Sequence, residues 1–181
     1  MTVSREDLHR AAFIAPPPDY THDIGLLVAM MHYVRLTTIQ AVGGLNGSQL
    51  DTIPQGFANS VGMLLAHIAA VDRLYQCLSF KNRGFDDEEW AHHAGAFSFG
   101  REGERVQGLS LEHHLENLKA ARIATLSELA RRDDAWLASS LVVPGIEHSN
   151  HHWAWFHVLE DEVSHRGQIR ILRKALETWA R

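Results

Sequence analysis

The stretch "HVLEDEVSHRGQIRILR", residues 157–173, decides the fold. Its apolar residues recur at the three- and four-residue spacing of an amphipathic helix. Asp161 lies four residues before His165, so both side chains occupy one face of that helix. Gly167 falls in the helix interior, where glycine costs about 0.5–1 kcal/mol relative to alanine. Because carboxylates are almost never buried without partners, this helix requires a compensating interaction beside Asp161.

The same periodicity recurs three more times along the 181-residue chain. It predicts long helices over about residues 21–43, 60–80, 110–132 and 150–179. Residues that favour helix starts precede the last three of them: Asn59 or Ser60, Ser110, and Ser149 or Asn150.

Between the second and third helices, residues 81–108 are rich in glycine and lack a sustained period, with at most a short helix near residues 86–92. An excursion of this length is typical of a lid or binding loop. No alternating strand pattern competes with the helices. We therefore predict an all-α four-helix bundle, formed by residues 1–181 as a single domain.

Composition narrows the classes of function. The net charge of −5, from 17 Lys and Arg against 22 Asp and Glu, argues against nucleic acid as a partner. The first residues lack the features of a signal peptide, and no apolar stretch is expected to reach the length needed to cross a bilayer, so we predict a cytoplasmic protein without a membrane partner. The single cysteine, Cys77, excludes a Cys-rich zinc site. Thirteen histidines favour a metal or acid–base site.

Three residues are the candidate metal ligands: His67, Asp161 and His165. His67 falls within the apolar stripe of the second helix, and His165 within that of the fourth. Helix bundles assemble metal centres in this way, from inward side chains of facing helices. Two imidazoles and one carboxylate suit one divalent ion, either Zn, Ni, Fe or Mn, and leave a coordination position open. An ordinary buried hydrogen-bonded pair is the alternative.

Other polar residues are weaker candidates. Glu162, three residues before His165, is a rival ligand, and Gln168 is a candidate for supporting a ligand through a hydrogen bond. His32 lies near the apolar face of the first helix. Gly167 is expected to let another helix approach closely. The adjacent histidine pairs are expected on solvated faces, because neighbours on a helix point about 100° apart: His92 and His93, His113 and His114, and His151 and His152.

Two segments carry a more specific signal: "NSVGMLLAHIAAVDRLY", residues 59–75, and "EDEVSHRGQIRILR", residues 160–173. In these two segments the chain resembles the DinB-like (YfiT-like) superfamily of metalloenzymes. The pieces "LLAHI" and "HRGQI" are the most specific parts of the resemblance. The resemblance implies a four-helix bundle with a histidine-rich metal site, often a homodimer. In characterised branches it implies transfer of thiols such as bacillithiol or mycothiol, or maleylpyruvate isomerisation.

The resemblance places the family's histidine of the second helix on His67 and the last histidine of its "HxxxH" pair on His165. The first histidine of that pair falls on Asp161, and a carboxylate there shifts preference toward harder ions. We therefore expect a divalent-metal-dependent enzyme that acts on a small molecule, with thiol S-transferase chemistry and a low-molecular-weight thiol as cosubstrate. A metal-dependent hydrolase at the same site and a non-catalytic, stress-related binding bundle are the alternatives.

The aromatic residues of the excursion, Trp90, Phe97 and Phe99, are expected either to cap the site or to fill a dimer seam. A homodimer is expected, and Leu176 and Trp179 near the C-terminus are one candidate for its interface.

Overall fold

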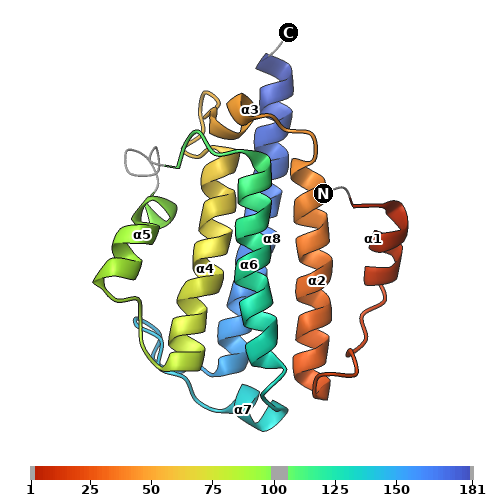
Figure 1. Ribbon diagram of the computed structural model, residues 1–181, viewed down its shortest axis with the longest axis vertical. Coiled ribbons are helices and arrows are strands. Elements are labelled where there is room, and N and C mark those ends of the chain that lie inside the picture. Colours follow the sequence, from red (N-terminus) through yellow and green to blue (C-terminus); the bar gives the residue numbers. More distant parts are fainter. Residues whose placement is uncertain (1–2, 99–105, 180–181) are drawn as a thin grey trace.

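The computed structural model describes residues 3–98 and 106–179, and within them the chain is helical (Figure 1). Two isolated bridges, between Ser140 and Asn150 and between Val143 and Ile146, are the only extended pairings in these residues. The prediction of an all-α bundle is confirmed. The helices are α1 (Arg5–Ala11), α2 (His22–Val42), α3 (Gly47–Asp51), α4 (Val61–Lys81), α5 (Asp87–Phe97), α6 (Leu111–Leu129), α7 (Asp134–Ala138) and α8 (His151–Trp179).

The four long helices α2, α4, α6 and α8 form the bundle, and their directions differ from a simple alternation. In Figure 1, α2 and α8 run from the lower end to the upper end, whereas α4 and α6 run from the upper end to the lower. The parallel neighbours α4 and α6 therefore need a long return connection, which contains α5. α4 packs against both α6 and α8, and α5 packs against α4.

Side-chain caps define where three of the long helices begin. The hydroxyl of Ser60 accepts a hydrogen bond from the backbone N–H of Met63, and that of Ser110 accepts one from His113. Of the two candidates for α8, Asn150 makes the cap, because its side chain accepts from the N–H of Trp153 at 2.7 Å.

Several helix boundaries differ from the sequence prediction. The short helix of the excursion continues to Phe97, several residues beyond the predicted end. The third long helix ends at Leu129 rather than near residue 132. There the side chain of Asp133 accepts a hydrogen bond from the N–H of Trp136 at 2.8 Å and begins α7, which the sequence did not predict.

The buried apolar side chains form two clusters, one in each half of the bundle. The lower cluster is built around Met31, Tyr75 and Trp155, and the upper cluster around Leu65 and Ile169. Between them lies a buried layer of charged side chains, called the charge layer below: Arg35, Asp72, Arg122 and Glu162. Two apolar residues of the long helices, Ile123 and Val163, are exposed.

Within the described part of the chain, α2 is long and apolar enough to cross a bilayer by length and composition. The expectation that no stretch reaches that length was therefore wrong. In the bundle, 61% of the qualifying window is buried inside the protein. This burial explains the composition of α2, because a core helix is apolar for the same reason as a membrane helix.

Candidate metal centre

The three predicted ligands meet between α4 and α8. One nitrogen each of His67 and His165 and one carboxylate oxygen of Asp161 all lie within 4.8 Å of one another. The Nε2 atom of His165 lies 3.2 Å from Oδ1 of Asp161, and Nε2 of His67 lies 3.6 Å from the same oxygen. The side chains of all three are mostly buried, with exposed fractions of 12–14%. The structure thus brings the predicted residues together, and their role as metal ligands remains a prediction.

Backbone geometry explains why these side chains converge. Asp161 and His165 are one turn apart on α8, and their side chains therefore occupy neighbouring positions on the helix surface. His67 faces them from α4, and its ring centroid lies 4.7 Å from that of His165. The neighbours of His67 on α4, Leu64 and Val71, are buried, so the packing of the core sets the rotation of this helix.

The orientation of the His67 ring is held by α5. Its Nδ1 atom donates a hydrogen bond to the carbonyl of Ala96 at 2.8 Å, since a carbonyl can only accept. In the neutral ring, the lone pair is then on Nε2, which faces Asp161. Phe97, the next residue on α5, lies edge-on against the same ring with centroids 5.4 Å apart. Hydrogen bonds of this kind fix the tautomer of imidazoles that bind metals.

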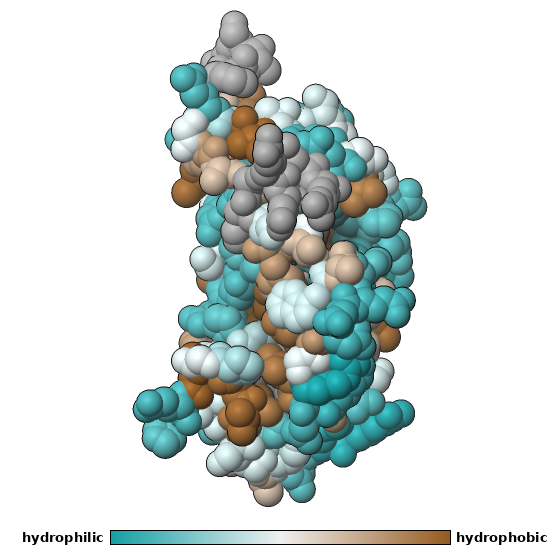
Figure 2. All heavy atoms as spheres, turned by 90° about the vertical axis from the view of Figure 1, so that its left-hand side faces the viewer, coloured by the Kyte–Doolittle hydropathy of each residue, from teal (hydrophilic) through white to brown (hydrophobic). Residues whose placement is uncertain are grey.

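Two aromatic residues of the excursion therefore have a defined place. Phe97 lies against the candidate site, and Trp90 packs on Phe97 and Phe85. Phe99 lies outside the described residues. The view of Figure 2 is onto this side of the molecule and shows apolar side chains gathered along its middle, between hydrophilic margins. Of the two alternatives expected for these aromatic residues, the position of Phe97 agrees with capping the site, whereas the hydrogen bond from His67 to Ala96 was not predicted.

Electrostatics favour the ionised form of Asp161 and the protonated form of His67. Burial by itself raises the pKa of Asp161, but the hydrogen bonds and charges of His165 and His67 outweigh it and hold this pKa well below its usual range. Burial likewise acts to lower the pKa of His67, and the hydrogen bond and charge of Asp161, with the Ala96 carbonyl, reverse the effect and raise it. A carboxylate that stays ionised in a mostly buried site attracts a cation.

The residues present fit a divalent ion. Among the described residues, Oδ2 of Asp161 and Nδ1 of His165 are buried atoms without a hydrogen-bond partner. The Nε2 lone pair of neutral His67 faces a carboxylate oxygen, which is repulsive unless a proton or a cation lies between them. Two imidazoles and a carboxylate are donors that Zn, Ni, Fe and Mn all accept, so the donor set does not select one of them.

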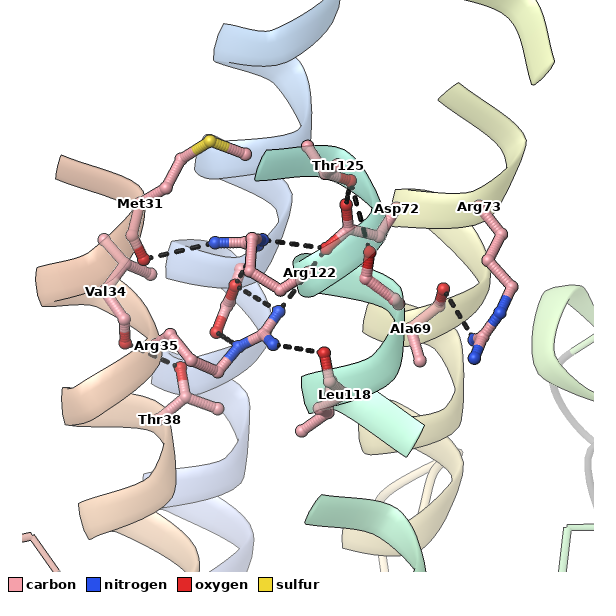
Figure 3. A network of polar contacts seen from close by, with 12 residues as sticks. Met31, Val34, Arg35, Thr38, Ala69, Asp72, Arg73, Leu118, Arg122 and Thr125 are labelled. Carbon is pink, nitrogen blue, oxygen red and sulfur yellow. Dashed lines mark hydrogen bonds and ion pairs between the residues drawn. The ribbon is translucent and has the colours of Figure 1, made fainter. Parts of the chain in front are cut away.

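The rival ligand Glu162 lies elsewhere. It is buried and belongs to the charge layer, which contains one charged residue from each long helix. Figure 3 labels the other three members of this layer: Arg35, Asp72 and Arg122. Nε of Arg35 donates to Oε1 of Glu162 at 2.7 Å, and Nη2 of Arg122 donates to Oε2 at 3.0 Å. Both oxygens of Glu162 are therefore occupied by arginines. Adjacent residues on a helix point about 100° apart, so Glu162 cannot face the two histidines while Asp161 does.

The rest of the charge layer is equally well paired. Nε of Arg122 donates to Asp72 at 3.0 Å, and the hydroxyl of Thr125 donates to the other oxygen of Asp72 at 2.5 Å. Arg35 also donates to the carbonyl of Leu118 at 2.7 Å. Burial raises the pKa of Glu162, but the two arginines outweigh it and lower this pKa overall. Two positive and two negative charges thus balance one another inside the bundle.

Sequence reasoning missed the charge layer, although a signal for it was present. Arg35 follows the buried Met31 by four residues, and Glu162 follows the buried Val158 by four. Each charge therefore occupies a core position of its helix. A charged residue at such a position needs an opposite charge inside the protein.

His32 and Gln168 each line a separate hollow of the surface. His32 is exposed on α2, beside a surface hollow near Asp7 and Arg10. Gln168 lines a small cavity with Phe57 and Asn59. Gly167 is exposed, and no atom lies within 4 Å of the position that a Cβ would take. The expected close approach of another helix of the bundle at Gly167 is therefore wrong.

Two of the adjacent histidine pairs are not simply solvated. His114 is only 1% exposed, and neither of its ring nitrogens has a hydrogen-bond partner among the described residues. His151 is also buried, and its Nδ1 lies 2.8 Å from the hydroxyl of Ser79, which accepts a hydrogen bond from Trp155. One member of each pair therefore packs inside the protein, because the two members point in different directions.

Comparisons with known proteins agree with this architecture. A family model described as mycothiol S-transferase matches residues 26–178. The crystal structure of a conserved protein from Enterococcus faecalis superposes with a TM-score of 0.67 at 16% sequence identity, covering 83% of this chain and 94% of that one. At this identity the likeness shows the fold alone. No curated protein matches the chain.

Proposed function

Since this chain belongs to the mycothiol S-transferase family, a DinB/YfiT-like family, we propose that it is a divalent-metal-dependent enzyme that transfers a low-molecular-weight thiol to an electrophilic small molecule. His67, Asp161 and His165 are the metal ligands in this proposal. The observation that carries it is the convergence of both Nε2 atoms on a single oxygen of Asp161.

A divalent ion held by these residues would supply a Lewis acid, which favours the thiolate form of a thiol at neutral pH. The protein then needs no nucleophile of its own, and the buried Cys77 has no part in the reaction. Asp161 supplies the negative charge that attracts the cation. Ala96 holds His67 in the tautomer that presents Nε2, and Phe97 shields one side of the ring.

Metal analysis of protein produced without a histidine tag tests the site. We expect about one ion per chain in the parent, and its loss in His67→Ala and Asp161→Ala while circular dichroism stays unchanged. His32→Ala is the matched control, because this histidine is exposed and lies away from the triad. A parent that neither contains metal nor takes up added Zn²⁺, Ni²⁺ or Mn²⁺ would favour the non-catalytic binding bundle.

The thiol step needs a separate measurement. With metal-loaded protein, we expect loss of free mycothiol in the presence of an electrophile, and no loss with Asp161→Ala. Release of product from the electrophile without loss of thiol would instead identify a hydrolase at the same site.

The proposed setting is the cytoplasm, with a small-molecule substrate and no nucleic acid or membrane as partner. The net charge of −5 supports the exclusion of nucleic acid. A homodimer is part of the same proposal.

A further inference from the structure

The bundle is open between α2 and α6. α2 packs along α8 and α4 packs along α6, but α2 and α6 touch only slightly. Two buried arginines bridge the space between them (Figure 3). Arg35 of α2 donates a hydrogen bond to the carbonyl of Leu118 on α6, and Arg122 of α6 donates one to the carbonyl of Met31 on α2. Beside these arginines remains a hollow of about 160 Å³, called the α2–α6 hollow below.

The walls of the α2–α6 hollow are aliphatic. They are formed by Leu36, Ile39, Leu115, Ile123 and Leu126, and no Phe, Tyr or Trp lines the hollow. The hollow adjoins two others along the same pair of helices. It shares Ile39 and Leu115 with a hollow of about 650 Å³ at the C-terminal end of α2, and Leu36 and Leu126 with one of about 400 Å³ beside α1. An elongated apolar ligand therefore fits this shape better than a compact one.

The charged residues that line the hollow are all positive: Arg35, Lys119 and Arg122. The two arginines are balanced by the carboxylates of the charge layer. Lys119 lies outside that layer. Its ammonium lies 3.4 Å from a carboxylate oxygen of Glu116, but both side chains are exposed, and such pairs contribute little free energy. The hollow therefore favours a ligand with one negative charge, which Lys119 would balance.

The two arginines also have hydrogen-bond donors that the protein does not use. A guanidinium group carries five N–H donors. Arg122 uses three of them in hydrogen bonds with the described residues. Arg35 likewise uses three, and its Nη2 atom lies 3.5 Å from Asp72 as well. At least one N–H of Arg35 and two of Arg122 are therefore left, on side chains that are almost fully buried. A carboxylate in the hollow would give these donors an acceptor.

We propose that the α2–α6 hollow binds an unbranched alkyl carboxylate, the chemistry of a fatty acid. The carboxylate lies between Lys119 and the unused N–H groups of the two arginines, and the alkyl chain follows the aliphatic walls along α2. An apolar site with a few convergent polar groups is the usual form of a small-molecule site. The triad lies between α4 and α8 and shares no residue with the hollow, so this inference is independent of the proposed enzymatic function.

The C-terminal end of α8 offers no comparable site among the described residues. Leu176, which the sequence suggested for a dimer interface, is buried inside its own chain. The side chain of Trp179 lies outside the described residues.

Isothermal titration calorimetry of the full chain with octanoate tests the proposal. We expect one octanoate per chain, and binding of 1-octanol and octylamine that is weaker by about tenfold or more, because they have the same alkyl chain without the negative charge. Benzoate keeps the carboxylate on a compact ring and should also bind more weakly than octanoate. No binding of octanoate up to about 1 mM, or equal affinities for octanoate and 1-octanol or for octanoate and benzoate, would overturn the proposal.

Two substitutions at the rim locate the site. Lys119→Glu reverses the positive charge, and Ile123→Glu places a carboxylate in the aliphatic wall, so each should weaken octanoate binding by about tenfold or more. The two side chains are 53% and 54% exposed, so the fold should tolerate both changes, and circular dichroism checks this. Lys119→Arg keeps the charge and should bind octanoate as the parent does. Ile171→Glu is the matched control, because this isoleucine is equally exposed but lies on α8.

A third variant separates the hollow from the triad. Carboxylates also bind metal ions, so octanoate is titrated into Asp161→Ala as well. Its affinity for octanoate should equal that of the parent, whether or not the parent binds a metal ion. Loss of octanoate binding in Asp161→Ala, or full binding in both Lys119→Glu and Ile123→Glu, would place octanoate outside the hollow and contradict the proposal.

Discussion

Asp161 and Glu162 are adjacent in the chain, yet they serve two different parts of the protein. Oδ1 of Asp161 lies 3.2 Å from Nε2 of His165 at the edge of the bundle, whereas Oε1 of Glu162 lies 2.7 Å from Nε of Arg35 in its interior. One carboxylate therefore belongs to the candidate metal centre, and the other stabilises the core beside it.

Glu162→Gln is expected to lower the free energy of unfolding by about 3 kcal/mol or more, because it leaves two buried arginines with a single buried negative charge. Urea denaturation followed by circular dichroism measures the effect. The folded variant should still bind metal, since both oxygens of Glu162 are occupied by Arg35 and Arg122.

Glu160→Gln is the control for this measurement, since Glu160 is an exposed carboxylate on the same helix. It should change stability by less than about 0.5 kcal/mol. Equal effects of the two substitutions would contradict the structural role given to Glu162.

His114 makes the protein sensitive to acid. Burial, followed by the charge of His113, lowers the pKa of His114 from 6.5 to about 4, while Asp51 opposes this shift weakly. Between these values the unfolded chain binds more protons than the folded one, so stability falls as pH falls through this window. The loss approaches ~3 kcal/mol at the lower end and is absent above the ordinary histidine pKa.

His114→Leu should remove this contribution and should not weaken the protein at neutral pH, because it replaces two buried unpaired nitrogens with apolar atoms of similar volume. Urea denaturation at neutral pH and at about pH 5 provides the comparison. His113→Leu, a change at the exposed neighbour, should keep most of the pH dependence of the parent, because burial is the larger cause of the lowered pKa of His114. If the free energy of unfolding depends on pH equally in His114→Leu and in the parent, a group other than His114 causes the loss of stability in acid.

Phe97→Ala is expected to weaken metal binding by about tenfold, because the ring supports the orientation of His67 that the Ala96 carbonyl sets. Competition with a chelator measures this affinity without any assay of catalysis. His92→Ala, an exposed change on the same helix, should leave it unchanged. Identical affinities for Phe97→Ala and the parent would show that α5 does not support the site.

The sequence by itself determined the helical class, the four long helices and the faces that most of them bury. These features follow from local causes: residues three and four apart share a face, and polar side chains cap helix starts at Ser60, Ser110 and Asn150. The sequence also identified His67, Asp161 and His165 as inward residues, because each lies in register with apolar neighbours on its own helix.

Only the tertiary structure decided which of two adjacent carboxylates faces the histidines. A rotation of α8 by one residue position would exchange Asp161 and Glu162, and this rotation is set by contacts with α2, α4 and α6. The tertiary structure likewise brought Ala96 of α5 to His67, 29 residues earlier in the chain. It also left Gly167 without a neighbour. Such contacts depend on how separate helices pack, which no local periodicity records.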